Sequence, residues 1–479
     1  MDGLNCNEIK YSKLFYDNFI FRLDSEFFGK DAILTDRKIN QSPCFYLKPS
    51  EVVSGPFGSS LKSDAYMSTG DIPFVRIENI RGGFDINMDN IVYISNSDNN
   101  RIRNSQLQTD DIILSKVGNS IGFFARIDDS ISVCNISENN IGIKLSEYPT
   151  VEKHYILTYL NCYYAQKLVL RRTSGNAQPK LNVRDLCYIP IPQFTNAFYG
   201  KISSIILNSK SLILRSKQIY IEAEEILIEN IGFFNNDIEK TSFSIKNLKN
   251  SFAESGRLDA EYYNPKYDML FKTLSKLKTK TLGGNNGLVY IKKSIEPGSE
   301  YYQEDGIPFV RVSDIDKFEI SNPDIKVSKD IVPNVELLYP KKDTILLSKD
   351  GSVGIAHKVQ KDMEAITSGA ILHLTIKNTD VILPEYLTLV LNSPVVQLQA
   401  ERDMNGAIIQ HWKPSDVEKA IIPILDMELQ RDIAEKVQES FQLRQESKQL
   451  LKLAVKAVEM AIETDEDTAL GWLAGQMQR

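Results

Sequence analysis

The chain contains the same series of short motifs twice, and this duplication limits the folds open to it. The segment RLDSEFF at residues 22–28 returns as RLDAEYY at residues 257–263, and IPFVR at residues 72–76 returns at residues 307–311. Both repeats are displaced by 235 residues. A common displacement over so long a stretch predicts two copies of one large unit, each able to bury its own core. Because the copies differ mostly between the shared motifs, we expect one task performed on two different targets.

Composition excludes several other classes of protein. Hydrophobic residues make up 42% and charged residues 25% of the chain, which is ordinary for a globular protein. No apolar run reaches the ~20 residues of a membrane helix, and the start lacks a secretory pattern, so we expect a cytoplasmic protein. The five cysteines and four histidines form no metal-ligand or redox motif. The net charge of −7 argues against coating a polyanion uniformly but permits a local basic surface.

Each copy follows the same predicted order of elements. The RLD segment is predicted as a short helix, and short strands with turns follow it. A helix predicted over 151–170, matched by 384–400, leads to a glycine-containing loop and a proline-bounded strand. Apolar residues at helical spacing then predict a long helix closing each copy. Helices of about 35 residues span roughly 50 Å, so we expect an antiparallel pair packed on each other, with ordinary core helices as the alternative.

No catalytic motif stands out. The segment Asn264–Tyr267 (NPKY) resembles the catalytic element of adenine methyltransferases, but lysine occupies its third position and no glycine-rich cofactor loop lies nearby. A helix-ending Asn-Pro pair is the simpler interpretation. The chain lacks the phosphate-loop, zinc-protease and serine-hydrolase signatures.

Two kinds of loop remain as candidate binding sites. The glycine loops are residues 114–122 (LSKVGNSIG) and 347–354 (LSKDGSVG), where a strand runs into a lysine and a glycine turn. Such a loop can present backbone N–H groups and a cation to a phosphate, or it can be a hairpin turn that needs glycine. Its candidate DNA contacts are Lys116, Asn119, Ser120, Lys349 and Ser352.

The amide loops are residues 173–182 (TSGNAQPKLN) and 404–413 (MNGAIIQHWK). Asparagine and glutamine pair with adenine, and lysine pairs with guanine or phosphate. Around the first amide loop the cations Lys167, Arg171, Arg172, Lys180 and Arg184 predict a local basic patch. The candidate contacts from these loops are Arg172, Asn176, Gln178, Lys180, Arg184, Gln410, His411 and Lys413.

The arginine segments, residues 76–79 (RIEN) and 311–314 (RVSD), keep the arginine and change the polar residues after it. A retained arginine is typical of a backbone contact, and changed neighbours are typical of sequence reading. Pairing of the arginine with the unit's own carboxylates is the alternative. The candidate contacts here are Arg76, Glu78, Asn79, Arg311 and Ser313.

The order and duplication of these motifs resemble the specificity subunits of type I restriction-modification systems, over about residues 22–463. The second amide loop departs from the pattern because it has no proline after Gln410. The resemblance implies an α+β fold with two pseudo-symmetric α/β target-recognition domains, 1–195 and 236–425. These would be separated by two long antiparallel helices, 196–235 and 426–463, with a tail at 464–479.

The resemblance also implies a function and partners. Each recognition domain would read one half of a bipartite asymmetric site on double-stranded DNA, and the chain itself would be non-catalytic. Two methyltransferase subunits and the restriction subunits would dock on it and supply S-adenosylmethionine, ATP and Mg²⁺. The alternatives are a stand-alone adenine methyltransferase and an assembly scaffold that never contacts DNA. The recognised sequence and the gap between its halves cannot be read from these motifs.

Overall fold

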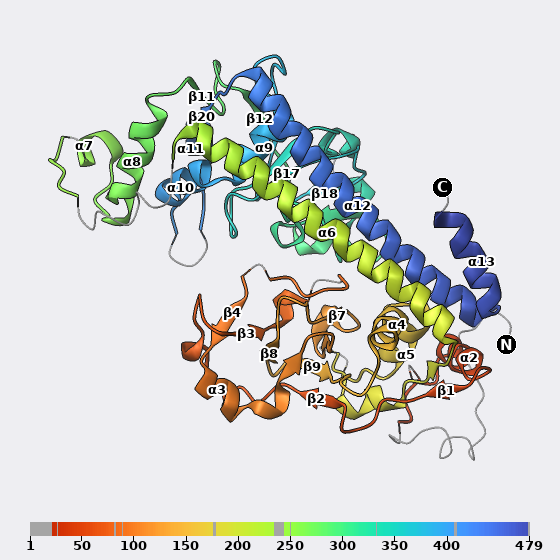
Figure 1. Cartoon of the computed structure of the whole chain (residues 1–479). Helices are drawn as coiled ribbons and strands as arrows, with labels where there is room; N and C mark the ends of the chain where they lie inside the picture. The colour runs from red at the N-terminus through yellow and green to blue at the C-terminus, as the bar shows by residue number, and fades with distance from the viewer. Residues whose placement is uncertain are drawn as a thin grey trace. The chain divides into compact units, whose positions relative to one another are not determined.

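A computed structural model describes residues 22–25, 27–80, 83–88, 90–175, 179–233, 244–249, 251–331, 333–406 and 410–477, with the backbone only for Asn119 and Glu254. The chain folds into two compact units (Figure 1). Unit 1 contains the residues up to Leu212 together with those from Glu446 onward, and unit 2 is Ile213–Gln445. Each unit therefore contains part of both long helices.

Unit 1 is built on two four-stranded sheets and a strand pair. The first sheet has the order β2-β9-β6-β7, with Val52–Ser54, Asn140–Ile143, Ile112–Ser115 and Phe124–Arg126, all antiparallel. The second has the order β4-β3-β8-β5, with Val92–Ile94, Ile72–Val75, Val133–Ile136 and Leu107–Gln108. Strands β1 (Cys44–Phe45) and β10 (Ile191–Pro192) form the pair. The helices are α2 (Lys30–Ile39), α3 (Asn96–Arg101), α4 (Thr150–Leu160) and α5 (Tyr163–Arg171).

Unit 2 repeats the first sheet and the strand pair, and its second sheet shares three strands with that of unit 1 but has its fourth strand at the opposite edge. Its first sheet has the order β12-β19-β16-β17, with Val289–Lys293, Ile371–Ile376, Ile345–Ser348 and Ala356–Lys358. Its second has the order β13-β15-β14-β18, with Tyr302–Gln303, Lys326–Val327, Ile307–Val310 and Ile366–Thr367. Strands β11 (Thr279–Thr281) and β20 (Ile421–Pro423) pair antiparallel. The helices are α7 (Phe252–Ser255), α8 (Pro265–Leu274), α9 (Pro384–Asn392), α10 (Pro394–Asp403) and α11 (Pro414–Val417).

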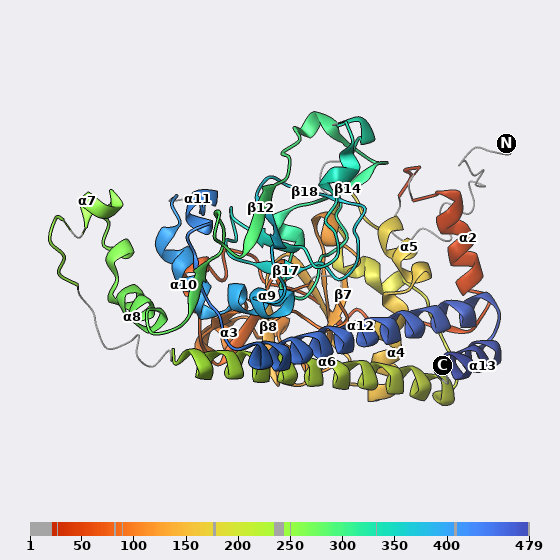
Figure 2. The same ribbon diagram turned by 90° about the horizontal axis from the view of Figure 1, so that it is seen from above.

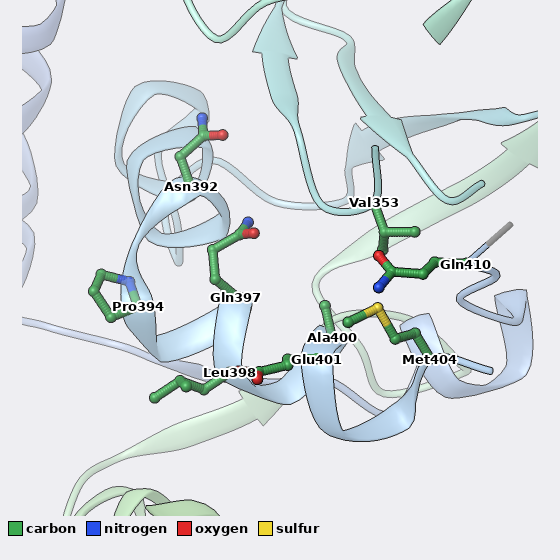
Figure 3. Close-up of a pocket in the computed structure, with 9 residues that line it drawn as sticks. All are labelled: Val353, Asn392, Pro394, Gln397, Leu398, Ala400, Glu401, Met404 and Gln410. Atoms are coloured by element: carbon green, nitrogen blue, oxygen red, sulfur yellow. The ribbon is translucent and has the colours of Figure 1, made fainter. Parts of the chain in front are cut away.

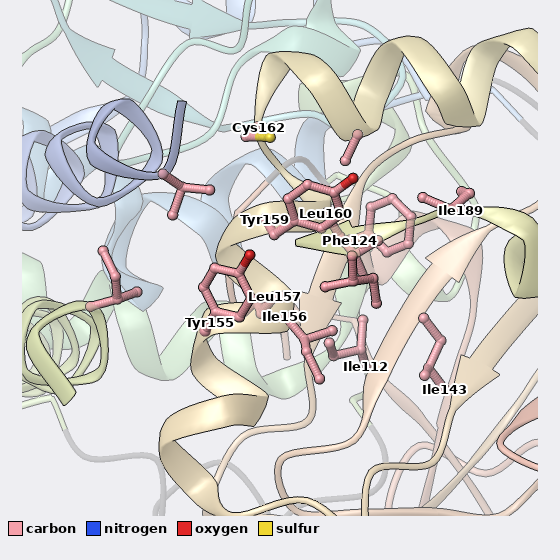
Figure 4. Close-up of a cluster of buried hydrophobic side chains, with 14 of the residues drawn as sticks. Ile112, Phe124, Ile143, Tyr155, Ile156, Leu157, Tyr159, Leu160, Cys162 and Ile189 are labelled. Atoms are coloured by element: carbon pink, nitrogen blue, oxygen red, sulfur yellow. The ribbon is translucent and has the colours of Figure 1, made fainter. Parts of the chain in front are cut away.

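Corresponding contacts hold the same elements together in both units. The hydroxyl of Tyr155 on α4 donates to the carbonyl oxygen of Pro192 at 2.7 Å, and that of Tyr386 on α9 donates to Pro423 at 2.9 Å. Both tyrosines are fully buried in the main core of their unit. Figure 4 shows Tyr155 and Tyr159 in one buried cluster with Ile112, Phe124 and Ile143 of the first sheet. A buried phenol needs a hydrogen-bond acceptor, so these bonds fix the helix on the strand pair.

The long helices are α6 (Asn196–Ile231) and α12 (Met427–Glu463), and they lie side by side (Figures 1 and 2). In unit 1 Ser209 on α6 contacts Ser447 on α12, and in unit 2 Ser216 contacts Ser440. Rising numbers on one helix meet falling numbers on the other, so the pair is antiparallel. The mixed fold with two similar sheet-rich units and a long helix pair matches the predicted fold class.

Several local expectations were wrong in detail. The first RLD segment is no helix in its described residues, where Arg22 pairs with Asp24, and the second contains only the 3-10 turn Glu261–Tyr263. The helix expected over 151–170 is two helices, α4 and α5, as are α9 and α10 in unit 2. Asn264 starts a helix and does not end one: its side chain accepts from the Lys266 N–H as the N-cap of α8, with Pro265 in the first turn.

The tail at residues 464–479 contains a further helix, α13 (Glu466–Met477). Ala469 and Leu473 on this helix are buried in the main core of unit 1. The carboxylate of Glu466 accepts from the backbone N–H of Thr195, just before α6 begins, at 3.0 Å. The tail therefore packs on unit 1 and ties down the start of α6.

Candidate nucleic-acid interface

The structure joins the glycine loop to the amide loop in each unit. In unit 1 the N–H of Leu181 donates to the carbonyl oxygen of Lys116 at 2.9 Å. In unit 2 the N–H of Trp412 donates to the carbonyl oxygen of Lys349 at 2.8 Å. Isolated β-bridges at Val117–Lys180 and at Asp350–His411 lie beside these bonds. Two motifs about 60 residues apart in sequence thus form one composite surface in each copy.

The first glycine of each glycine loop serves this joint. Gly118 has φ +70° and its N–H donates to Pro179 at 3.2 Å, while Gly351 has φ +72° and its N–H donates to Gln410 at 2.9 Å. A positive φ favours glycine, and both loops connect antiparallel strands. The hairpin interpretation therefore accounts for these glycines, because their N–H groups are engaged by the protein.

A glutamine fixes the second glycine of each glycine loop. The side-chain amide of Gln166 donates to the Gly122 carbonyl at 2.6 Å, and that of Gln397 donates to Gly354 at 2.7 Å. Gln397 also lines a pocket of about 440 Å³ with Val353, Met404 and Gln410. Figure 3 shows Gln410, Met404 and Val353 gathered together, with Gln397 projecting from α10. The glycine and amide loops of unit 2 thus both border this pocket.

Burial removes part of the predicted basic patch. Arg172 is 8% exposed, donates to the Tyr188 carbonyl at 2.8 Å and has its pKa lowered by burial. Arg171 is also buried, donating to the Phe27 carbonyl at 2.6 Å. The prediction that Arg172 contacts DNA is therefore corrected, since its guanidinium is buried and bonded to the end of the 3-10 helix Val183–Tyr188. Lys180 and Arg184 remain exposed, whereas Asn176 and Gln178 lie outside the described residues.

The two lysines of the glycine loops are less open than the sequence indicates. Lys116 donates to the Ser54 hydroxyl at 2.9 Å, and burial lowers its pKa. Lys349 is 8% exposed and pairs with the Asp350 carboxylate. An oxygen of the same carboxylate lies 2.8 Å from His411 Nδ1. Ser120 is half-buried, and Ser352, Gln410, His411 and Lys413 are exposed. The Asn119 side chain lies outside the described atoms.

The arginine segments have one backbone geometry and different surface chemistry. The N–H of Arg76 donates to the Asn79 side chain at 2.9 Å, and that of Arg311 donates to Asp314 at 2.8 Å. Asn79 is fully buried, and its amide also donates to the Asn87 carbonyl at 3.0 Å. Its predicted base contact is therefore corrected to a structural role. Between the ends of each turn, Glu78 and Ser313 are both exposed.

Both arginines pair with carboxylates of their own unit, as the alternative interpretation expected. Arg76 forms an ion pair with Glu78, and Arg311 lies 3.5 Å from Asp314. Arg76 also has a buried Nε–H that finds no hydrogen-bond partner among the described residues.

Each arginine segment borders a hollow, and the two hollows are copies. The first hollow, in unit 1, measures about 270 Å³, and the second, in unit 2, about 530 Å³. Equivalent residues line both, including Phe74 and Phe309. One cation and two carboxylates line the first hollow: Arg76, Glu78 and Glu138. Three cations and two carboxylates line the second: Lys293, Arg311, Lys349, Glu296 and Asp350. The two hollows thus have equivalent positions in the fold but differ in the charge of the residues that line them.

Sequence reasoning missed Glu138, Glu296 and Lys293. They lie outside every duplicated motif, and only the strand pairing brings them to the arginine segments. The glycines of residues 55–58 (GPFG) were the one available signal, because closely spaced glycines indicate a close backbone approach.

A family model described as the type I restriction modification DNA specificity domain matches residues 282–453. Residues 282–453 are thus similar to a type I DNA specificity domain. The matched segment includes the second hollow with its glycine and amide loops. Unit 1 repeats the strand order of the first sheet and the loop bonds of the matched segment, so it is a second copy of the same core fold.

Individual proteins resemble the chain as well. The type I restriction enzyme EcoBI specificity subunit of Escherichia coli is 26% identical over 148 residues, which are 31% of this chain and 31% of that subunit. The match thus spans about a third of the curated relative. A solved type I S subunit from M. genitalium is 16% identical at a TM-score of 0.34, covering 91% of this chain and 96% of that one. The HsdS subunit from Thermoanaerobacter tengcongensis is 14% identical at a TM-score of 0.28, covering 89% and 96%.

Within the described ranges, no helix is long and apolar enough to cross a membrane. In the same part of the chain, no three His, Cys, Asp or Glu side chains group as a metal site.

Proposed function

We propose that this chain is the DNA sequence-specificity subunit of a type I restriction-modification complex, and that each unit binds one half of a bipartite asymmetric site. One observation carries the proposal most: an identical scaffold of glycine loop, amide loop and arginine segment presents different side chains in the two units. A duplicated reader of one fixed target has no need to change its exposed positions. Two domains that bind different half-sites must differ at those positions.

The exposed polar residues are the proposed contacts. In unit 1 they are Glu78, Lys180 and Arg184, and in unit 2 they are Ser313, Ser352, Gln410, His411 and Lys413; the half-buried Arg76 and Arg311 are proposed contacts as well. A carboxylate such as Glu78 accepts from the amino group of cytosine or adenine, whereas lysine and arginine suit guanine or phosphate. The first hollow, with its excess of carboxylates, therefore favours a base that presents an amino group. The cationic second hollow favours guanine.

The partners follow from the same proposal. Two methyltransferase subunits would dock on the chain and bind S-adenosylmethionine, and restriction subunits would bind ATP and Mg²⁺, leaving this chain without a catalytic step. Helix α6 supports a docking role because Leu214 and Ile221, seven residues apart in unit 2, are 54% and 46% exposed. Residues seven apart lie on one face of a helix, and an exposed apolar stripe is a common partner surface.

A segment exchange tests the reading role. Thr281 pairs with Ile421, and the N–H of Leu282 donates to Ala420 at 2.8 Å, so the ends of residues 282–420 lie next to each other. This segment of unit 2 is replaced by its equivalent from a related chain, and methylated adenines are mapped by sequencing host DNA with the methyltransferase present. One half-site should change while the other stays. A change in both halves, or in neither, would contradict the proposal.

A second experiment addresses the helices as a spacer. Inserting four residues, about one helical turn, into α6 should alter the gap between the half-sites or abolish methylation. The control insertion goes into the surface segment 360–363 of unit 2, where it should leave the gap as it was. Unchanged spacing with full activity after the α6 insertion would count against the spacer role.

The two alternative functions have tests of their own. A stand-alone methyltransferase would use Asn264 in catalysis, but its side chain caps α8 and accepts from the Lys266 N–H. Methyl transfer from labelled S-adenosylmethionine to DNA by the purified chain alone would revive that alternative. An assembly scaffold predicts that footprinting of the partner-bound complex finds no protected DNA.

A further inference from the structure

The strand pairing defines which residues of the two units are equivalent around the hollows. In unit 1 Val52 of β2 pairs with Ile143 of β9, which neighbours Ile112 of β6. In unit 2 Ile291 of β12 pairs with Leu374 of β19, which neighbours Ile345 of β16. Val52 is thus equivalent to Ile291. Counting five residues onward in each strand and loop places Phe57 at the position of Glu296.

In both units a carboxylate bonds the loop after β2 or β12 to the turn before β9 or β19. The carboxylate belongs to the turn in unit 1 and to the loop in unit 2. In unit 2 the carboxylate is Glu296, which accepts from the backbone N–H of Gly369 at 2.8 Å. In unit 1 it is Glu138, at the position of Gly369, which accepts from the N–H of Gly58 at 2.6 Å. The hydrogen bond between loop and turn is thus present in both units, but the carboxylate comes from the other segment. Position 57 therefore does not need to supply the carboxylate that Glu296 supplies in unit 2.

The released position carries a phenyl ring that faces solvent. Phe57 is 83% exposed. Its loop is held closely, because a Cβ on Gly55 would overlap the carbonyl oxygen of Ser137 and one on Gly58 would lie 2.9 Å from Glu138. The ring also lines the first hollow together with Arg76 and Glu78. An isolated exposed apolar residue needs no explanation, but a phenyl held on a pinned loop at a polar hollow is a preorganised contact.

We infer that Phe57 makes an apolar contact with a base of the half-site bound by unit 1. The inference rests on the proposed DNA-binding function and adds a residue type that the polar contacts lack. A phenyl ring meets a duplex in one of two ways. It packs on the methyl group of thymine in the major groove, or it enters between base steps and stacks on an unstacked base. Unit 2, with Glu296 at this position, makes no such contact.

The test uses the full chain with its methyltransferase subunits and a duplex containing the sequence that this complex methylates. Phe57→Ala should weaken binding about tenfold, a change typical of a lost aromatic contact, while Phe57→Tyr, which keeps the ring, should bind within about twofold of the unchanged chain. Leu34→Ala, at an exposed apolar residue of α2 in the same unit, is the matched control. Melting temperature and complex assembly of all three are compared with the parent.

Modified duplexes separate the two kinds of contact. If the ring packs on a methyl group, uracil in place of thymine at one position of the half-site of unit 1 should reproduce the loss, and Phe57→Ala should add little to it. If the ring unstacks a base, 2-aminopurine in that half-site should brighten on binding of the parent and not of Phe57→Ala. Either result supports the contact.

Equal affinity of Phe57→Ala and the parent for the specific duplex would overturn the inference, as would a loss that Phe57→Tyr fails to avoid. The proposed function fails differently, because the parent complex would then show no preference for any methylated sequence. Substitutions in the half-site of unit 2 serve as the internal control: their effect on affinity should be the same with Phe57 and with Ala at position 57.

Discussion

The hydroxyl oxygens of Ser216 on α6 and Ser440 on α12 lie 2.9 Å apart, and both side chains are fully buried. Their partners by duplication, Ser447 and Ser209, lie 2.7 Å apart in unit 1. The same four serines thus form two equivalent crossings along the antiparallel pair. Serine at these points lets the helices approach closely and fixes their register through buried hydrogen bonds.

Ser440→Ala should destabilise unit 2 more than Ser216→Ala. The Ser440 hydroxyl also donates to the Ser216 carbonyl oxygen at 3.0 Å, so its removal breaks two bonds and leaves a buried hydroxyl behind. We expect a loss of about 1–2 kcal/mol in the free energy of unfolding for Ser440→Ala and about half that for Ser216→Ala. Urea unfolding measures both. Equal losses would show that the carbonyl bond contributes nothing.

Two alanine substitutions within the second glycine loop should differ in cost. A Cβ on Gly351 (φ +72°) meets open space, whereas one on Gly354 (φ +90°) would lie 2.7 Å from Gln397, whose amide is engaged by Gly354 and Leu391. Gly351→Ala should cost about 1 kcal/mol for the left-handed backbone. Gly354→Ala should cost roughly 2–3 kcal/mol, because strain and displaced hydrogen bonds add. Thermal or urea unfolding compares them, and a reversed order would contradict the packing described for Gln397.

Unit 2 should lose stability in mild acid because of two buried histidines. Burial lowers the pKa of His357 to about 4 and that of His373 to about 4, against about 6.5 in an unfolded chain. Between these values the unfolded state binds more protons. The stabilisation is therefore complete above about pH 6.5 and is lost as the pH falls toward 4.

The expected loss between pH 7 and pH 5 is about 2 kcal/mol per histidine. His373→Gln, which leaves a polar partner for the Thr367 hydroxyl now 2.7 Å from Nε2, should reduce the pH dependence by about half. Urea unfolding at the two pH values measures this. A pH dependence that His373→Gln leaves unchanged would show that His373 is not the titrating group.

Lys180→Gln should lower the salt dependence of DNA binding. Each neutralised phosphate adds about −0.9 to the slope of log K against log salt concentration, and Lys180 is exposed on the amide loop. The slope of the partner-bound complex should become shallower by about one, with specificity retained. Lys361→Gln, at an exposed lysine of the strand connection in unit 2, is the control and should leave the slope unchanged. A loss of specificity without a change of slope would assign Lys180 to a base instead.

Features set by local sequence could be predicted. The duplicated motifs identified two copies, and uninterrupted apolar spacing identified both long helices, because helix periodicity is visible within a few turns. The glycine turns were also legible, since a positive φ restricts the residue type. Helix boundaries were harder to predict from the sequence. The break between α4 and α5 contains no proline, whereas Pro394 marks the equivalent break in unit 2.

Exposure, by contrast, was decided by the tertiary structure. Arg172 and Asn79 have the chemistry of DNA contacts, yet partners distant in sequence or around the turn bury them and use their hydrogen bonds. Glu138 and Phe57 belong to no motif, yet strand pairing brings both to the first hollow. The sequence determined that two similar units and two long helices form, because those follow from local periodicity and repetition. Which side chains face a ligand depended on packing between segments, and local pattern carries no information about that.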